Sequence, residues 1–286
     1  MKKYLKITLF FLIFIFNIYA QDKNPKVALV LGAGGQRGYA HVGVLEVLEE
    51  NNIPIDLIVG SSAGSMVGAF YAHYKDAKKV HDIFCSVDLM NLLNINFWTL
   101  HLGLSDTKNM KDMLEKNIGD INFSDLKIPF ACIAADLDTG ALVNFDKGKL
   151  IPSVIASCSV PFLMDPVKYD GKILVDGGIV DKIPVSTAKQ YNPDVIIAID
   201  IRDPLEKKYD YNIAGFSKRA IEIMEYQQYE YNIKGADIVI KPNLFSVSFF
   251  DSSHREEFHE LGRKAALEMM PKILKLLKDK NILPNY

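Results

Sequence analysis

Short apolar runs, each suited to one buried strand, alternate along the chain with segments in which apolar residues recur at helical spacing. The predicted strands are residues 26–31, 56–59, 130–135, 141–145, 173–175, 195–200 and 236–240. The predicted helices are a segment that ends near 51, an amphipathic stretch within 103–118, and residues 63–74, 151–157, 184–190, 216–233, 253–270 and 273–280. Pro271, which has no N–H, is expected to restart or kink the last helix. This alternation predicts one α/β domain with a mainly parallel central sheet and helices on both faces.

The first two predicted strands flank a helix and are joined by a short crossover, so they are expected to be parallel. Within that helix the apolar residues Ala40, Val44 and Leu48 share one face. Because parallel strands point the same way, the residues that follow 31 and 59 should meet at one edge of the sheet. Any chemistry carried by those two turns is therefore predicted to lie together.

The N-terminus has a different pattern. Residues 1–6 are basic, residues 7–18 are almost wholly apolar and residues 21–25 are polar, which is the layout of a secretory signal peptide. The apolar run is shorter than the roughly 20 residues that span a bilayer. We predict a signal peptide at residues 1–20, a domain at 21–286, and export to the periplasm, the outer membrane or the medium. Because Ile18 fits the cleavage pattern poorly, an uncleaved N-terminal anchor is the alternative.

Composition narrows the function classes. The chain has 286 residues with a formal net charge of −2, so no basic footprint indicates nucleic-acid binding. Its three cysteines, Cys85, Cys132 and Cys158, show no metal-binding spacing and are interpreted as small buried residues. No acidic cluster has the spacing of a calcium loop. We therefore expect no metal and no cofactor, and the oligomeric state stays open.

Residues 87–104 are apolar and include the only tryptophan, Trp98. Three interpretations stay open for this segment. It is a cover over the site, a surface that enters lipid, or a set of helices that pack on the core.

Residues 60–64 read Gly-Ser-Ser-Ala-Gly, between a predicted strand and a predicted helix. Gly-x-Ser-x-Gly in a strand–turn–helix context is typical of a nucleophile elbow. Gly60 and Gly64 permit the tight turn, and Ser62 stands at its tip. The helix N-terminus carries about half a positive charge, which favours an oxyanion there. The pattern predicts that Ser62 is a nucleophile.

Residues 32–38 form a glycine-rich loop after the first predicted strand. Arg37 occupies the place where a dinucleotide fingerprint needs its third glycine, and no Gly-Lys-Ser/Thr follows, so neither a Rossmann motif nor a P-loop is indicated. Consecutive glycines expose backbone N–H groups that stabilise developing negative charge. We predict that Gly34 and Gly35 donate to an oxyanion, with Arg37 either holding the loop or attracting an anionic head group.

Asp176 ends a short predicted strand and precedes Gly177 and Gly178. A carboxylate in this place is either an ordinary turn residue or the base that activates Ser62. An aspartate with a pKa near 3.9 is a weak base towards an alcohol. The site must therefore raise that pKa by burial or stabilise the oxyanion strongly, and the sequence leaves both routes open.

Three motifs in this order resemble the patatin-like phospholipase family: Gly-Gly-x-Arg-Gly at 34–38, Gly-x-Ser-x-Gly at 60–64 and Asp-Gly-Gly at 176–178. Residues 40–45, 136–140 and 156–161 are also similar to that family, and the resemblance covers roughly residues 26–200, leaving a C-terminal helical region at 201–286. It implies a three-layer α/β/α fold and lipid acyl hydrolysis. This sequence departs from the family pattern at Ala33, where many members have a third glycine.

The resemblance also implies roles for individual residues. Ser62 would be the nucleophile and Asp176 the general base and later acid, with no catalytic histidine. Gly34 and Gly35 would form the oxyanion hole with Arg37 beside them. The substrate would be a phospholipid or another lipid ester, reached by contact with a membrane surface. Head group, positional preference and the balance between hydrolysis and acyl transfer stay open.

Two alternatives remain from the residues themselves. An α/β-hydrolase-type esterase would use a triad in the order Ser, Asp, His, which Ser62, Asp176 and either His254 or His259 satisfy. Against it, both histidines fall in or beside the charged stretch 251–260, which is expected to be an exposed helix start. A non-catalytic lipid-binding module that keeps the fold is the second alternative.

Overall fold

The computed structural model describes residues 26–87, 92, 94–95, 103–205, 209–247, 251 and 253–284. The predicted signal peptide and most of the apolar segment 87–104, Trp98 included, lie outside these residues. Within them, the main sheet has eight strands in the order β11-β10-β1-β2-β5-β9-β8, with β6 pairing to β5. Their bounds are β1 Val27–Leu31, β2 Leu57–Ser61, β5 Phe130–Asp136, β6 Leu142–Phe145, β8 Val167–Tyr169, β9 Lys172–Asp176, β10 Val195–Ile199 and β11 Ile238–Ile240.

Five neighbouring strands, from β11 to β5, are parallel, as the sequence pattern predicts. β9 is antiparallel to β5, with Ala134 opposite Asp176. On the other side of β5, Ile133 lies opposite Ser61 at the end of β2. The antiparallel strand therefore returns its last residue to the edge at which the parallel strands end, next to the turn that follows β2.

Side chains alternate between the two faces of the sheet, and two separate apolar cores result. On β1, Val27, Leu29 and Leu31 belong to the larger core, whereas Ala28 and Val30 belong to the smaller one. The larger core is completed by helices α2 Tyr39–Glu50, α3 Ala63–Tyr74, α4 Ala77–Ser86, α5 Lys108–Asn117, α6 Leu150–Ser157 and α9 Arg255–Asp279.

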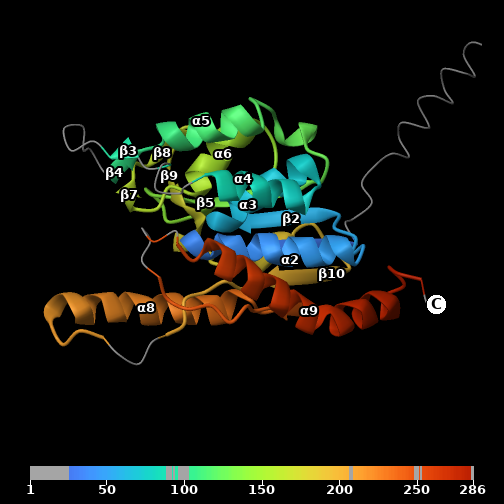
Figure 1. Ribbon diagram of the computed structural model, residues 1–286. Helices are drawn as coiled ribbons and strands as arrows, with labels where there is room; N and C mark the ends of the chain where they lie inside the picture. The colour runs from blue at the N-terminus through green and yellow to red at the C-terminus, as the bar shows by residue number, and fades with distance from the viewer. Residues whose placement is uncertain are drawn as a thin grey trace, which may run out of the picture.

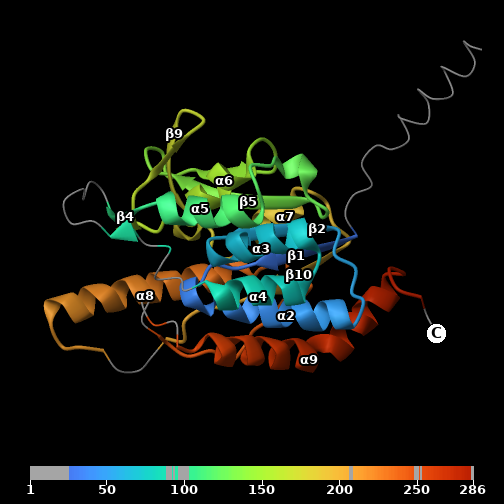
Figure 2. The same ribbon diagram turned by 45° about the horizontal axis from the view of Figure 1, so that its top comes forward.

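Two helices, α7 Val185–Lys189 and α8 Ile213–Asn232, contribute to the smaller core on the opposite face. Figures 1 and 2 show the resulting layers, with α2 and α9 lying side by side. The three-layer arrangement confirms the predicted fold class.

Several boundaries differ from those expected. α9 runs continuously through Pro271, so a restart of the helix there is wrong, and a kink stays a prediction. Pro271 removes only the bond to the carbonyl of Leu267, and that residue lies on the solvent side of the helix with 53% of its surface exposed. Helix α4 was not predicted. A small sheet of β3 Asn94–Ile95, β4 Gly103–Asp106 and β7 Phe162–Met164 was not predicted either.

Both ends of α8 also differ slightly from the predicted bounds, 216–233. α8 begins at Ile213, before the predicted start at 216, where the Asn212 side chain accepts from the N–H of Gly215 and caps the helix. Within the described ranges, no helix has the length and apolar character needed to cross a bilayer.

Candidate active site

Ser62 occupies a strained turn between β2 and α3. Its backbone angles are φ 53° and ψ −121°, a left-handed conformation that costs a non-glycine residue about 1–3 kcal/mol. The turn packs against β1 so closely that a Cβ on Gly64 would lie 2.1 Å from the carbonyl oxygen of Leu31. Glycine at 64 is therefore required by contact. The chain bends sharply at Ser62, and α3 begins at the next residue, as the nucleophile-elbow pattern predicts.

Asp176 lies directly against Ser62. The Ser62 hydroxyl donates to Oδ2 of Asp176 across 2.5 Å, and the N–H of Gly178 donates to Oδ1 across 2.7 Å. Ser62 is 6% exposed and Asp176 is 4% exposed, so water hardly competes for this bond. A hydrogen bond to an ionised carboxylate is about twice as strong as one between neutral groups. The Ser62 hydroxyl is therefore held against the carboxylate of Asp176, a group that can accept its proton.

Burial changes the basicity of Asp176. Removal from water raises its pKa from 3.8 to about 6, against the opposing effects of the bonds from Ser62 and Gly178. The carboxyl is therefore ionised at neutral pH and yet a far stronger base than a solvated aspartate. The sequence left open two ways to make Asp176 effective, a pKa raised by burial or strong stabilisation of the oxyanion. The raised pKa is present in the structure.

Ser157, at the end of α6, supports the turn from a third element. Its Oγ accepts from the N–H of Ser62 across 3.2 Å and lies 2.6 Å from Oγ of Ser65. The neighbouring Cys158 thiol donates to the carbonyl of Ser62 across 3.1 Å. Sequence reasoning assigned no role to either residue. The only signal was their place within residues 156–161, one of the stretches that resemble the family.

The glycine loop crosses the ends of β1 and β10. Ala33 donates its N–H to the carbonyl of Lys182 and accepts from the Tyr229 hydroxyl, so its N–H is occupied by the fold. Among the described residues, the N–H groups of Gly34 and Gly35 donate to no acceptor. Both glycines line the hollow that contains Ser62 and Asp176. Gly35 has φ 55°, which glycine adopts without strain.

Arg37 lines the same hollow as Ser62 and Asp176 but bonds to other residues. Its Nε donates to the carbonyl of Ile201 across 2.9 Å, and one terminal nitrogen lies 2.5 Å from Oδ1 of Asp203. Its own N–H donates to the carbonyl of Gly34. These contacts fit the interpretation in which Arg37 holds the loop, because they tie it to Gly34 and to the residues that follow β10.

Two hollows meet at Ser62. The first, here called the apolar cavity, is lined by Tyr39, Met66, Val67, Phe84, Leu92, Met110, Cys158 and Met164. The second, here called the polar groove, is lined on its far side by charged and polar residues that include Lys182, Asp203, Arg219, Glu222, Glu225 and Tyr226. Ser62, Gly35, Gln36 and Val160 border both hollows. An apolar site and a polar site therefore adjoin each other at the serine.

None of the described histidines contacts Ser62 or Asp176. His41 bonds to the carbonyl of Gly32, and burial lowers its pKa to about 4. His254 faces Glu257. His259 is only 5% exposed and lies beside Glu46, so the expectation that it sits on an exposed helix start is wrong. It is buried because α9 packs along α2 (Figure 1).

The cysteines are not all alike. Cys132 and Cys158 are buried, as expected. Cys85 is only partly buried and contacts His81 and Glu256, so the interpretation of Cys85 as an inert apolar residue is wrong. It belongs to a polar cluster between α4 and α9.

A known protein family matches the part of the chain that carries Ser62 and Asp176. The family model described as patatin-like phospholipase matches residues 29–189. An uncharacterized NTE family protein of Mycobacterium tuberculosis is 33% identical over 182 residues, which are 63% of this chain and 50% of that protein. Lysophospholipase NTE1 of Coccidioides immitis is 33% identical over 210 residues, which are 68% of this chain and 13% of that protein. The chain therefore spans 50% of the length of the first of these relatives and 13% of the second.

Solved structures share the fold. VipD from Legionella pneumophila superposes with a TM-score of 0.61 at 11% identity, over 87% of this chain and 67% of VipD. Full-length ExoU of Pseudomonas aeruginosa, in complex with SpcU, superposes with a TM-score of 0.52 at 14% identity, over 88% of this chain and 53% of that chain. At these identities the likeness concerns the fold alone.

Proposed function

Since the chain belongs to the patatin-like phospholipase family, we propose that it is a serine lipid acyl hydrolase that works through Ser62 and Asp176. One observation carries the proposal: the buried 2.5 Å bond between Ser62 Oγ and Asp176 Oδ2 at the junction of the apolar cavity and the polar groove. The serine is thus presented with its base, an apolar site and a polar site at once.

The proposed reaction has two halves. Ser62 Oγ attacks the ester carbonyl while Asp176 takes its proton, and the N–H groups of Gly34 and Gly35 bind the resulting oxyanion. The tetrahedral intermediate then collapses. The alcohol leaves with the proton from Asp176, and the acyl group stays on Ser62. Water, activated by Asp176, releases the fatty acid and restores the serine.

The two hollows indicate the substrate class. The apolar cavity suits one acyl chain, and the polar groove suits the rest of a lipid ester, such as a phospholipid or a lysophospholipid. Large apolar residues are exposed: Ile179 and Leu205, which line the polar groove, are 53% and 37% exposed, and Phe162 is 86% exposed. These side chains would enter the surface of a bilayer. A signal peptide at residues 1–20, followed by a domain at 21–286, would bring the enzyme to membranes outside the cytoplasm.

A Ser-Asp-His triad is less well supported, because the described histidines bond elsewhere. A non-catalytic lipid-binding module would have no use for the strained Ser62 or for two free amides beside it. The triad and the binding module each predict an outcome of the following experiment that differs from the one expected for Ser62 and Asp176.

The test is fatty-acid release from mixed phospholipid vesicles by the full chain and by residues 21–286, run beside Ser62→Ala and Asp176→Asn. We expect release by the parent and near-background rates for both variants. Loss with Ser62→Ala alone would require a different base. No release on any lipid by the parent would favour the binding module.

A further inference from the structure

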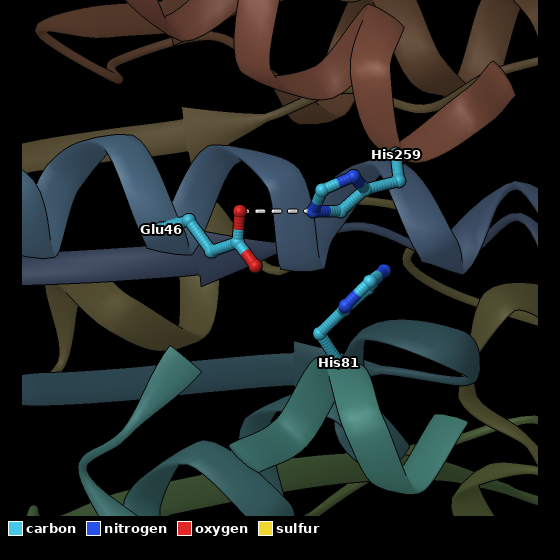
Figure 3. A group of neighbouring side chains, drawn as sticks. All are labelled: Glu46, His81 and His259. Carbon is cyan, nitrogen blue, oxygen red and sulfur yellow. Dashed lines mark ion pairs between the residues drawn. The ribbon is translucent and has the colours of Figure 1, made fainter. Parts of the chain in front are cut away.

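A second cluster of reactive side chains lies at the junction of α2, α4 and α9. Two overlapping groups occur among the described residues: His81 with Cys85 and Glu256, and His81 with Glu46 and His259. In each group the ligand atoms lie within 4.8 Å of one another. Figure 3 shows Glu46, His81 and His259 converging from three helices. The proposed hydrolysis uses none of these residues.

The distances in the first group match those of a coordination shell. His81 Nε2 lies 3.3 Å from Cys85 Sγ and 3.5 Å from an oxygen of Glu256, and that carboxylate lies 3.1 Å from the same sulfur. Ligands placed tetrahedrally around Zn²⁺ at about 2.0–2.3 Å are separated by about 3.3–3.7 Å. Because His81 and Cys85 are four residues apart on α4, they share one face of that helix.

His259 lies beside this group. Its side chain is 7% exposed, its Nε2 lies 3.0 Å from Oε2 of Glu46, and its Nδ1 lies 3.5 Å from Oε1 of Glu260. Its ring stacks on that of His81 with the centroids 4.3 Å apart. Because both ring nitrogens face carboxylates, His259 packs against His81 and is not counted among the ligands.

Glu46 holds the ring of His259. Its Oε2 lies 3.0 Å from Nε2 of His259, the pair joined by the dashed line in Figure 3. The same oxygen accepts from Arg263 across 2.7 Å. Arg263, Glu46 and His259 therefore form a connected polar group beside His81.

We propose that His81, Cys85 and Glu256, with a solvent molecule as the fourth ligand, bind a divalent transition ion of the Zn²⁺ class at a site separate from Ser62 and Asp176. Thiolate and imidazole ligands favour Zn²⁺ over Mg²⁺ or Ca²⁺, which prefer oxygen. When the Sγ–metal bond forms, the Cys85 thiol proton leaves to solvent. The exposed side chain of Glu256, 64% accessible, gives the ion a route in.

The ion would fasten α4 to α9. Phe84, between His81 and Cys85 in α4, lines the apolar cavity. Binding would therefore hold one wall of that cavity and stabilise the fold without entering the chemistry. The inference does not depend on the proposed hydrolysis, since it rests on other residues and is measured without a substrate.

The experiment uses the full chain, purified without a metal-binding tag and stripped with a chelator. Equilibrium dialysis with Zn²⁺ should give one ion per chain. Co²⁺ should give a thiolate charge-transfer band with the visible bands of a four-coordinate ion. Zn²⁺ should raise the midpoint of thermal unfolding.

Cys85→Ser should abolish the charge-transfer band. Cys85→Ser and Glu256→Gln should each weaken Zn²⁺ binding by more than about tenfold, because even outer-shell changes cost about 10–100-fold. Glu256 is exposed, so its variant tests the site without endangering the fold. Glu257→Gln, one residue along α9 and paired with His254, is the matched control and should bind as the parent does.

Absence of stoichiometric Zn²⁺ in the parent would overturn the proposal and leave the cluster as a polar contact between helices. Equal binding by the parent, Cys85→Ser and Glu256→Gln would overturn it as well, because the ion would then lie elsewhere.

Discussion

Replacement of Asp176 by asparagine should abolish activity and at the same time make the protein more stable. Asp176 is 4% exposed, and burial raises its pKa from 3.8 to about 6. Each unit of such a shift corresponds to about 1.4 kcal/mol. The ionised carboxylate therefore lowers the free energy of unfolding by about 3 kcal/mol relative to its neutral form. Asparagine keeps the shape, accepts from Gly178 and donates to Ser62, but it carries no charge.

The gain must depend on pH. Because the folded pKa lies above the unfolded one, the contribution of Asp176 is fully favourable below about pH 4 and is lost as the pH rises through about 6. The stability difference between Asp176→Asn and the parent should therefore grow from about 0.5 kcal/mol near pH 4 to about 3 kcal/mol near pH 8. Urea unfolding of both proteins across this range measures it, and titrations shared by the two cancel.

Asp181→Asn is the matched control. Burial also raises the pKa of Asp181 to about 6, and its carboxylate bonds to Ser186 rather than to Ser62. Its variant should show a similar pH-dependent gain in stability with activity retained. Two results would show that buried Asp176 does not have a raised pKa. One is an Asp176→Asn protein that is less stable than the parent near pH 8, and the other is a stability difference between the two proteins that does not change with pH.

Three further predictions concern the same site. The kcat/KM of the parent should fall about tenfold per pH unit below about pH 6, because Asp176 must be ionised; a flat acid limb in the pH–rate profile would count against this base. Ser157→Ala removes the acceptor of the Ser62 N–H and should lower kcat about tenfold with KM kept, whereas equal changes in both constants would indicate a general loss of structure. His254→Ala and His259→Ala should retain most of the fatty-acid release, and a loss of about a thousandfold in either would favour a triad.

Much of the fold follows from local patterns. The parallel strands were predictable because each apolar run is flanked by a helix, and Gly60 to Gly64 were recognisable because Ser62 falls where a strand gives way to a helix. α3 has the bounds that the helical spacing predicts. These features depend on residues close together in the sequence.

What could not be predicted depends on contacts between distant residues. The pairing of β9 with β5 decides that Asp176 reaches Ser62, and no local pattern specifies it. The burial that raises the pKa of Asp176 comes from packing of several elements. Ser157 looked like one more serine in a helix, and the cluster around His81 joins residues as far apart in sequence as Glu46 and His259. For that cluster the one local signal was the spacing of His81 and Cys85 on α4.

The central claim is that Asp176 makes Ser62 a nucleophile. The most direct measurement is the rate at which a fluorophosphonate probe modifies the parent and Asp176→Asn, with the adduct located by mass spectrometry. We expect a single adduct on Ser62 of the parent and much slower labelling of Asp176→Asn, whose fold is intact or stabilised. An adduct on another residue, or equal rates for the two proteins, would contradict it.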